Sequence, residues 1–344
     1  MRSEAFVPRE SVLVHRGLLK SDKDWQAIFD ATPGASVFQS PDWARRMERC
    51  LGSHLARPYS FEFADGTQVV WPTLQRPMRR VFNYLEAMPL GIYGTPIIRG
   101  EWSPEKGREI LRSVLAGRCL EMRYVEDPTR EALSFLLPSG VTQQVRLTET
   151  HILDLPATWD TMWQTRFSKN MRNQVRKAEK QGLTLRRGRS AAEVDSFYRL
   201  YQECTKIWGY GRPPHSREYF LTLMDNAPDA LQLLLVEDHG KAVAGSILVE
   251  DAESVLAWYG AMDRIVAKKC PTRFLLSHVV REAIGDGKKY LNMGASGHLE
   301  GVRTFKELWH CRPVAYSTIV FRRQHLMDRI DGGSRILRRV WKRE

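Results

Sequence analysis

The chain has 344 residues, 43% hydrophobic and 27% charged, and no stretch approaches the roughly 20 apolar residues that a membrane-spanning helix needs. Charged residues interrupt the first thirty positions, which argues against a secretory signal and predicts a cytoplasmic protein. Five widely spaced cysteines without a C-x-x-C pair predict reduced thiols and no metal site.

The net charge of +12 is concentrated in two segments. Residues 166–189 hold nine Lys or Arg and a single carboxylate, Glu179, and residues 322–344 hold eight basic residues against three acidic ones. The rest of the chain is close to neutral. Two basic patches on a neutral body indicate an anionic partner that is bound at defined places.

The first half predicts helices, then a hairpin. Residues 21–32 have a helical pattern, and in the next helix Ser40 is the expected N-cap, Pro41 the first residue and Gly52 the stop. Residues 59–77 alternate around Asp65-Gly66, which is a strong hairpin signal. We expect a helix at 104–116, a strand at 120–127, and a further helix and strand up to residue 156.

The second half predicts a similar order of elements. The expected helices cover residues 159–181, with a break near Phe167 and Ser168, then 191–207, 216–224 and 272–284. The expected strands cover residues 231–237, 242–250, 254–262 and 290–294, and a short helix and a strand follow from residue 302.

Both halves read as helices first, then a hairpin meander, then a helix and a strand. This order predicts a mixed α/β fold made by internal duplication. A chain of this length also predicts two domains. We place them at residues 1–155 and 156–322, followed by a basic helical tail at 323–344.

Four segments carry a resemblance to a known family. They are "FQSPDWARR" at 38–46, "FSKNMRNQVRKAEKQGLTLR" at 167–186, "KAVAGSILV" with "AWYGAMD" at 241–263, and "YLNMGASG" with "GVRTFKELW" at 290–309. In this order they resemble the Fem family of non-ribosomal peptidyltransferases and its FemAB-like relatives over nearly the whole chain. The resemblance implies two tandem GNAT-fold domains, which transfer an amino acid from aminoacyl-tRNA to an amine of a peptidoglycan precursor.

The basic run at 166–189 predicts an amphipathic helix with one cationic face. Met171, Val175 and Ala178 form an apolar stripe, and like charges repel one another on the opposite face without benefit unless an anion lies there. We therefore predict tRNA binding, which the family resemblance also favours, and the open alternative is an ordinary solvated helix. The predicted anion-binding residues are Lys169, Arg172, Arg176, Lys177 and Lys180.

A strand that opens into a loop provides the predicted substrate site. Asn292, Gly294 and Ser296 lie at this transition, where ligands often bind, although a simple turn would have the same residues. Phe305 and Lys306 match the F-K pair of the family, and the resemblance implies that they support catalysis near the acyl donor. A plain amphipathic helix is the alternative. His310 stands where relatives commonly carry glycine.

Three arginines and two aromatic residues complete the predicted substrate-binding set. Arg45 matches a family position that contacts the diphosphate of a precursor, and Arg212 or Arg217 is a candidate partner for the same anionic acceptor. Trp258 and Tyr259, on a predicted core strand, either line the acyl slot or belong to the core. Arg46 is expected to be exposed beside Arg45.

The donor is left open between aminoacyl-tRNA and acyl-coenzyme A. In GNAT proteins a glycine-rich loop binds the coenzyme A pyrophosphate, but here no glycine occurs between Arg264 and Ile284, which favours aminoacyl-tRNA. No tightly bound cofactor and no metal are expected.

We expect direct attack of an acceptor amine on an activated acyl ester. Lys306 is predicted to stabilise the tetrahedral intermediate, while no general base is identified and Glu307 is only a weak candidate. The enzymatic alternative is an acyl-coenzyme A-dependent transferase acting on a sugar, a polysaccharide precursor or a small amine. The third reading is a non-catalytic adaptor that binds RNA or membrane. The basic tail would suit peripheral contact with an anionic membrane surface.

Overall fold

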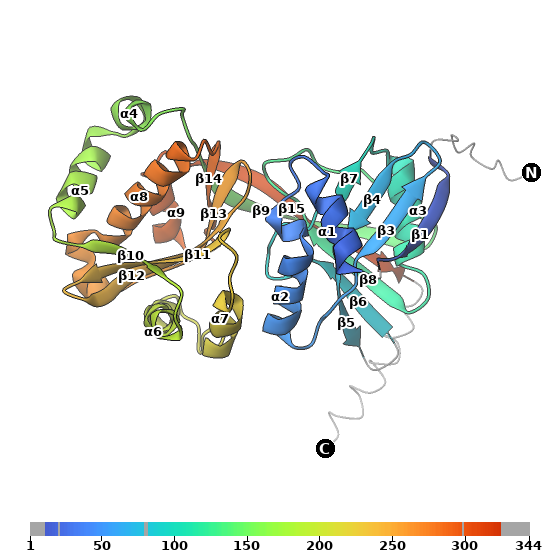
Figure 1. The fold of residues 1–344 in the computed structure, drawn as a ribbon, viewed down its shortest axis with the longest axis horizontal. Helices are drawn as coiled ribbons and strands as arrows, with labels where there is room; N and C mark the ends of the chain where they lie inside the picture. Colours follow the sequence, from blue (N-terminus) through green and yellow to red (C-terminus); the bar gives the residue numbers. More distant parts are fainter. Residues whose placement is uncertain (1–10, 20, 79–81, 298, 325–344) are drawn as a thin grey trace, which may run out of the picture. The chain divides into compact units, whose positions relative to one another are not determined.

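The computed structural model describes residues 11–19, 21–78, 82–297 and 299–324 (Figure 1). The chain forms two compact units. Unit 1 comprises the described residues up to Thr148 together with those from Tyr316 onward, and unit 2 comprises Glu149–Ala315. The expected division placed residues 316–322 in the second domain, whereas here they belong to unit 1. The predicted tail lies outside the described residues beyond position 324.

Unit 1 is a mixed α/β unit with two sheets. Its helices are α1 (Asp22–Asp30), η2 (Val37–Gln39), α2 (Pro41–Leu51) and α3 (Pro104–Val114). Its strands are β1 (Leu13–Leu18), β2 (Leu55–Ala56), β3 (Tyr59–Phe63), β4 (Gln68–Trp71), β5 (Leu74–Met78), β6 (Phe82–Ala87), β7 (Ile97–Arg99) and β8 (Cys119–Val125). One sheet has the order β1-β3-β4-β7, and the second runs β8-β6-β5-β2.

Local signals define the boundaries of helix α2. The Ser40 hydroxyl accepts a hydrogen bond from the Trp43 amide, Pro41 occupies the first turn, and Gly52 takes a left-handed conformation with φ of 63°. The hairpin at Asp65-Gly66 also forms as predicted, with Gly66 at φ of 85°.

Unit 2 has one large sheet covered on both faces. Its helices are α4 (Trp159–Thr161), the π-helix η3 (Met162–Arg166), α5 (Lys169–Glu179), α6 (Ala191–Ile207), α7 (Arg217–Met224), the 3-10 helix η4 (Arg264–Lys269), α8 (Pro271–Gly285) and α9 (Glu300–Glu307). Its strands are β10 (Thr184–Gly188), β11 (Leu231–Asp238), β12 (Lys241–Glu250), β13 (Ser254–Met262) and β14 (Tyr290–Ala295). Two strands, β9 (Val141–Asp154) and β15 (Arg312–Arg323), run from one unit into the other.

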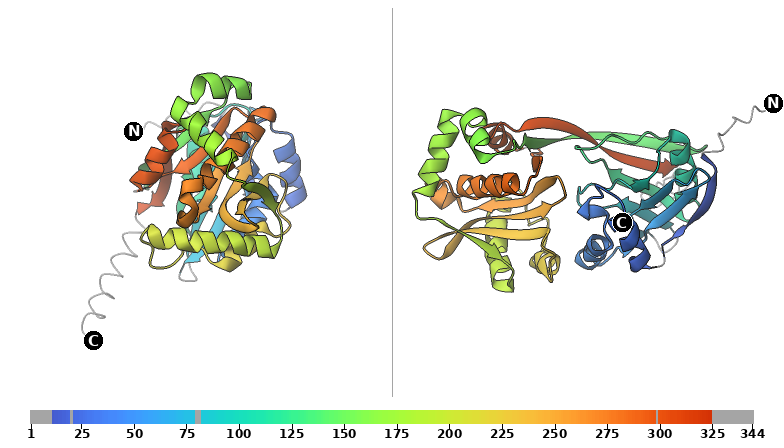
Figure 2. Two further views of the ribbon diagram at one scale, coloured as in Figure 1. Left: turned by 90° about the vertical axis from the view of Figure 1, so that its left-hand side faces the viewer. Right: turned by 45° about the horizontal axis from the view of Figure 1, so that its top comes forward.

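The sheet of unit 2 has the order β10-β11-β12-β13-β14-β9. Helices α5 and α8 cover one face, while α6 and α7 lie against the other (Figures 1 and 2). Alternate residues of β11 serve the two faces. Leu234 and Val236 join the cluster that contains α5 and α8, whereas Leu235 lies beside Gly245, against which Phe197 of α6 packs.

The two units share an order of elements: a strand, two helices, antiparallel strands, a helix and a further strand. The tandem mixed α/β prediction is confirmed, but in each unit the shared order begins with a strand that the sequence did not indicate, and in unit 2 the helices α4, η3 and α5 precede that strand. These strands, β1 and β10, are sheet edges rich in polar or charged side chains, which is typical of edge strands and hides them from hydrophobic patterns.

The further helix expected after residue 127 is absent, since the described residues 128–140 have no regular structure. Pro128 and Pro138 limit helix formation at its two ends. Tertiary contacts hold the segment instead, because Phe135 packs between Trp102 and Trp71. Packing therefore overrides the local pattern here.

Candidate functional site

Strands β13 and β14 pair with each other only over their first three residues. The parallel register runs from Ser254 opposite Tyr290 to Leu256 opposite Asn292. Beyond this point β13 continues to Met262 and β14 to Ala295 without a shared ladder. Main-chain groups at a strand separation can hydrogen-bond to an extended ligand, so this is a natural place for a substrate.

Lys306 is buried next to this strand end. Its side chain on α9 is 5% exposed, and its Nζ donates a hydrogen bond to the Gly294 carbonyl oxygen at 2.8 Å. Burial lowers the pKa of Lys306 to about 8. Among the described residues, Gly294 is its hydrogen-bond acceptor and no carboxylate pairs with it. An ammonium has three donors, so two remain for a ligand.

Asn292 shapes the end of β14. Its Oδ1 accepts hydrogen bonds from the Thr150 hydroxyl at 2.6 Å and from the Gly294 amide at 2.9 Å. These bonds support the left-handed conformation of Gly294, which has φ of 73°. The bent strand end in turn presents the Gly294 carbonyl to Lys306. Asn292 is thus a positioning residue for the lysine.

Ser296 and His151 extend the polar cluster. The Ser296 Oγ lies 3.4 Å from Nδ1 of His151, and Nε2 of His151 lies 3.8 Å from a Glu149 carboxylate oxygen. The Ser296 and His151 side chains are 5% and 1% exposed. Burial lowers the pKa of His151, and the positive charge of Lys306 lowers it further. Both effects favour the neutral form of His151.

A surface hollow of about 550 Å³ lies on the other side of helix α9, where Phe305 lines it. Arg273, in the first turn of α8, places its guanidinium 5.5 Å from the centre of the Phe305 ring. The rest of the lining comes from Glu300, Gly301, Thr304 and Leu308. An aromatic ring beside a cation at a helix N-terminus suits a planar or anionic group of a ligand.

The predicted acyl-slot aromatics lie on β13. A register shift opposite Ile247 and Leu248 leaves Trp258 as the extra residue of a β-bulge, a device that often occurs near active sites. The Tyr259 hydroxyl contacts the Tyr219 hydroxyl at 3.1 Å and His215 Nε2 at 3.2 Å. Tyr259 is therefore part of a packed aromatic cluster, in line with the core alternative.

The segment between β13 and α8 differs from a glycine-rich phosphate loop. Residues Arg264–Lys269 form the 3-10 helix η4, and Cys270 adopts φ of 57° at the start of α8. Lys269 pairs with Asp238 at 2.6 Å. The segment without glycine thus forms a helical connection, which differs from a loop whose backbone amides are free to bind a phosphate.

Helix α5 combines an apolar stripe with cations in two different states. Met171, Val175 and Ala178 are buried as predicted. Arg172 bonds to the carbonyl oxygens of Trp163, Gln164 and Phe167, so it satisfies the end of the preceding helix. All three bonds use Nη1, so this part of the guanidinium has a structural role, and the expected role of Arg172 as an anion ligand stays a prediction.

The other cations of α5 face solvent. Arg176 lies over the Trp163 ring at 5.1 Å. Lys169, Lys177 and Lys180 are exposed, and no ion pair engages their side chains among the described residues. This group, which we call the α5 lysines, keeps its charge available for a polyanion.

In unit 1, the surroundings of Arg45 and Arg46 both differ from those that the sequence analysis expected. Arg45 is held by Asp22 and Glu48, both at 2.9 Å, and these carboxylates raise its pKa. A phosphate would have to displace two carboxylates to bind it. Arg46, which the sequence analysis placed at the surface, is 1% exposed, so that expectation was wrong. In the W-A-R-R segment of α2, Trp43, Ala44 and Arg46 are buried.

Arg212 and Arg217 lie on and beside the connection that leads into α7. Arg212 is exposed in a bend, and Arg217 forms two hydrogen bonds with Asp195, at 2.6 and 2.9 Å. The carboxylate of Asp195 already supplies the bidentate partner that a phosphate would offer Arg217.

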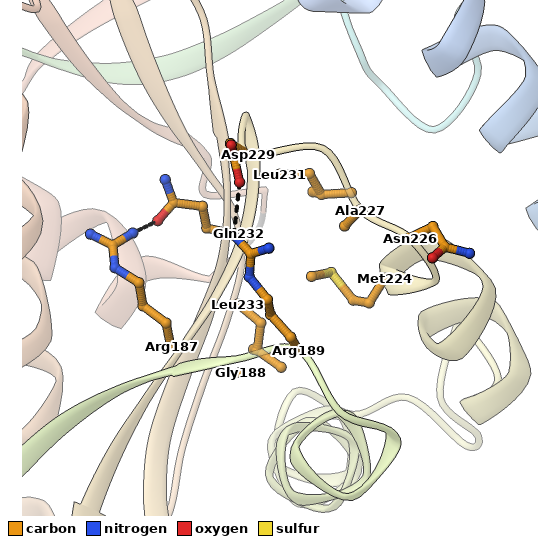
Figure 3. Close-up of a pocket in the computed structure, with 10 residues that line it drawn as sticks. All are labelled: Arg187, Gly188, Arg189, Met224, Asn226, Ala227, Asp229, Leu231, Gln232 and Leu233. Carbon is orange, nitrogen blue, oxygen red and sulfur yellow. Dashed lines mark hydrogen bonds and ion pairs between the residues drawn. The ribbon is translucent and has the colours of Figure 1, made fainter.

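A second hollow, of about 470 Å³, lies at the edge strand β10 (Figure 3). Its arginines are already engaged, since Arg187 bonds to Gln232 and Arg189 pairs with Asp229 (Figure 3). Leu231 and Leu233 supply an apolar wall. It contains no buried titratable group, in contrast to the cluster around Lys306.

Within the described ranges, no group of His, Cys, Asp or Glu side chains could hold a metal ion. The helices of the same ranges are too short or too polar to cross a membrane. All five cysteines are free thiols, as expected.

Comparison with known proteins identifies the second unit. Residues 165–307 match the family model described as "Acetyltransferase (GNAT) domain". Unit 2 is therefore similar to GNAT acetyltransferase domains and has a GNAT-type fold. The early separation of β13 from β14 and the polar cluster at the β14 end lie within the matched residues. The search of curated proteins found no match to this sequence.

Solved structures extend the likeness to both units. A structure of FemX has 13% sequence identity and a TM-score of 0.66, and the match covers 92% of this chain and 99% of that one. A protein of unknown function from Bacteroides thetaiotaomicron VPI-5482 has 12% identity and a TM-score of 0.57, over 90% and 100% of the two chains. The C-terminal domain of a putative lysylphosphatidylglycerol synthetase from Agrobacterium fabrum has 12% identity and a TM-score of 0.52, over 87% and 92%. The resemblance to FemAB-like proteins is confirmed for the fold.

The structure brings together residues that the sequence analysis had not connected. Lys306, Asn292, Gly294 and Ser296 were predicted, but Thr150 and His151 were not. Both lie on β9, more than 140 positions earlier in the chain, and the register of β9 against β14 brings them alongside. The only sequence signal was a pair of polar residues at the start of the apolar "ILDL" run.

Proposed function

We propose that the chain joins an activated acyl group to an acceptor amine, with aminoacyl-tRNA as the donor and a phosphate-bearing cell-envelope precursor as the acceptor. The observation that carries this proposal is Lys306, a buried lysine with a single described acceptor at the end of β14 in a GNAT domain. A buried cation without a carboxylate partner is costly, and an oxyanion would compensate for it.

The chemistry assigned to Lys306 is electrostatic. As the amine nitrogen attacks the acyl carbon, the carbonyl oxygen becomes negatively charged, and the Lys306 ammonium stabilises that charge. The Gly294 carbonyl fixes the position of Nζ at 2.8 Å before the substrate arrives. Loss of the ammonium above its pKa of about 8 would therefore slow the reaction.

Two features support aminoacyl-tRNA as the donor. The α5 lysines present three exposed positive charges that no described residue pairs with, which suits an RNA backbone. The 3-10 helix η4 replaces the glycine-rich loop that would bind a coenzyme A pyrophosphate. The hollow beside Phe305 and Arg273 would receive a base or a phosphate at the donor end.

Acyl-coenzyme A is the competing donor, and the match of residues 165–307 to an acetyltransferase family model favours it. The acceptor in that case would be a sugar, a polysaccharide precursor or a small amine. A peripheral membrane contact through the basic tail stays a proposal for either donor, because residues 325–344 lie outside the described ranges.

The experiment that tests the proposal supplies both donor classes to the purified chain. Radiolabelled aminoacyl-tRNA pools and acyl-coenzyme A pools are incubated separately with lipid-linked and nucleotide-linked envelope precursors, with and without ribonuclease. Label in an amide product from tRNA only, abolished by ribonuclease, is the expected result. Label from coenzyme A that resists ribonuclease would replace the donor, and binding of RNA without transfer from any donor would make the chain an adaptor.

A further inference from the structure

Three polar side chains at the ends of β14 and β9 form a chain of contacts that the chemistry assigned to Lys306 does not use. Glu149, His151 and Ser296 follow one another at 3.8 Å and 3.4 Å, with His151 in the middle. His151 presents Nδ1 to the serine and Nε2 to the glutamate. At 3.8 Å the Glu149 carboxylate is too far from Nε2 for a hydrogen bond, but its negative charge favours the neutral tautomer with the proton on Nε2. The Nδ1 lone pair then faces the serine hydroxyl.

Burial of polar groups costs free energy unless they are fully hydrogen-bonded, and a protein can retain such a cost where the groups have a function. His151 is 1% exposed and Ser296 is 5% exposed, and the bond between them is long for a structural one. Proton-transfer contacts are often long before substrate binds and shorten in the productive complex. Ser296 also lies two residues after Gly294, which anchors Lys306. Ser296 thus directly follows β14, the strand that carries the acceptor of Lys306.

We infer that Ser296 and His151 form a proton relay that accepts the proton of the attacking amine, with Glu149 orienting the imidazole. The inference rests on the proposed acyl transfer, for which a base was missing. An alkylamine with a pKa of about 10.4 is almost wholly protonated at neutral pH, so a bound ammonium must lose a proton before its nitrogen can attack.

The proton balance closes within the site. The bound ammonium passes one proton to the Ser296 oxygen as the Ser296 hydroxyl passes its own to Nδ1 of His151, and the imidazolium releases it to solvent. The neutral amine then forms the C–N bond, and the second nitrogen proton follows the same route. The C–O bond of the ester, or the C–S bond of a thioester, then breaks. The imidazolium gives the second nitrogen proton to the leaving oxygen or sulfur.

Several charged groups act on His151 from the elements around it. Lys306 and Arg303 on α9 lower its pKa, whereas Glu149 on its own strand and Glu307 on α9 raise it. Removing a positive neighbour should therefore raise the pKa of His151, and removing a negative one should lower it. The neutral state suits a base that works without a free charge in a buried site.

The test compares His151→Gln and Ser296→Ala with two matched controls on α8. His278→Gln removes a half-buried histidine that bonds to the Phe274 carbonyl, and Ser277→Ala removes a buried hydroxyl with the same acceptor. Initial rates of amide formation are measured from pH 6.5 to 8 with the donor that the wild type uses. Imidazole proton resonances of the full chain are titrated in parallel, including Glu149→Gln and Lys306→Met.

The relay predicts distinct pH profiles. Between pH 6.5 and 7.5, wild-type kcat/KM should change less steeply with pH than that of the relay variants, and toward pH 8 it should fall as Lys306 loses its proton. His151→Gln and Ser296→Ala fall by about 100-fold at pH 7, then rise about tenfold per pH unit as free amine appears. The controls match the wild type. In the titration, Glu149→Gln lowers the pKa of His151 and Lys306→Met raises it.

Other outcomes overturn the inference. A uniform loss across the pH range would assign His151 a structural role, and rates within threefold of wild type would remove it from the reaction. Either result would contradict the relay without contradicting the proposed acyl transfer. A wild-type chain that transfers no acyl group from either donor would remove the proposed function, and the relay with it.

Discussion

The two units each bury one lysine, and the two side chains differ in what surrounds them. Lys106 in unit 1 is 2% exposed and donates to the Asp65 carboxylate, the Thr67 hydroxyl and the Glu101 carbonyl. Lys306 in unit 2 is 5% exposed and donates to the Gly294 carbonyl. All three donors of Lys106 are used, whereas two donors of Lys306 have no described acceptor.

This difference separates a structural cation from a functional one. A lysine whose three donors meet a carboxylate, a hydroxyl and a carbonyl is stable without any ligand. A lysine that burial forces toward neutrality, with a pKa lowered to about 8, gains most when an anion develops beside it. A related contrast occurs on α5, where Nη1 of Arg172 bonds to three carbonyl oxygens and the α5 lysines form no ion pair among the described residues.

The largest expected effect is on turnover. Lys306→Met should reduce kcat by about 10²- to 10⁴-fold, because it removes the charge that stabilises the tetrahedral intermediate. Its thermal unfolding temperature should not fall, since the variant also removes a buried charge. Steady-state rates with circular dichroism on the same samples measure both. Turnover near that of the wild type would remove Lys306 from the mechanism.

The next effect concerns RNA affinity. Replacing all three α5 lysines, Lys169, Lys177 and Lys180, by Gln should weaken tRNA binding and reduce the salt slope of log Kd by about three. The charge-matched control is Arg186, Arg187 and Arg189 on and just after β10, each replaced by Gln. These arginines are ion-paired with Glu193, Glu282 and Asp229. Filter binding at several salt concentrations distinguishes the two; equal slopes for both variants would contradict the assignment.

A third effect is on stability in unit 1. Lys106→Met should lower the free energy of unfolding by about 1–3 kcal/mol, since it leaves Asp65 and Thr67 without their donor. Turnover per folded molecule should stay unchanged. Urea unfolding gives the first quantity and active-site-normalised rates give the second. A loss of turnover without a loss of stability would reverse the roles given to the two lysines.

The smallest effect is a dependence on pH. The pKa of Lys306 is near 8 in the folded chain and about 10.4 when unfolded, so the unfolded state binds more protons between these values. Wild-type stability should therefore rise relative to Lys306→Met from pH 8 to about 10. Asp65, whose pKa the Lys106 ammonium lowers to about 2, acts at the acid end: its stabilisation is lost from about pH 4 to 2. Denaturant titrations across pH, with Asp65→Asn as reference, measure both trends.

Much of the fold follows from local signals in the sequence. Helix α6 has the predicted bounds because Ser190 and Glu193 form a capping box, and His239-Gly240 turns the chain between β11 and β12 with both residues at positive φ. The edge strands β1 and β10 escaped prediction, because a strand with charged side chains has no apolar alternation to reveal it.

The site was only partly predictable, for a different reason. Lys306 and Asn292 follow from a motif, but the fate of a charged side chain depends on which acceptors the fold brings to it. Nothing in the sequence shows that three carbonyls at the end of η3 engage Arg172, or that Asp22 and Glu48 hold Arg45. His310 illustrates the same point: it adopts φ of 60° and so keeps the backbone that a glycine would give.

The anchor of Lys306 is a main-chain oxygen. Side-chain substitutions nearby cannot delete that acceptor, so the residues around it are free to diversify toward new acceptors while the cation keeps its place. The exception is Gly294, whose left-handed conformation any other residue would strain. Substitutions around Lys306 could therefore change the substrate preference while its ammonium stays in place. Gly294 is the residue whose substitution would disturb that position.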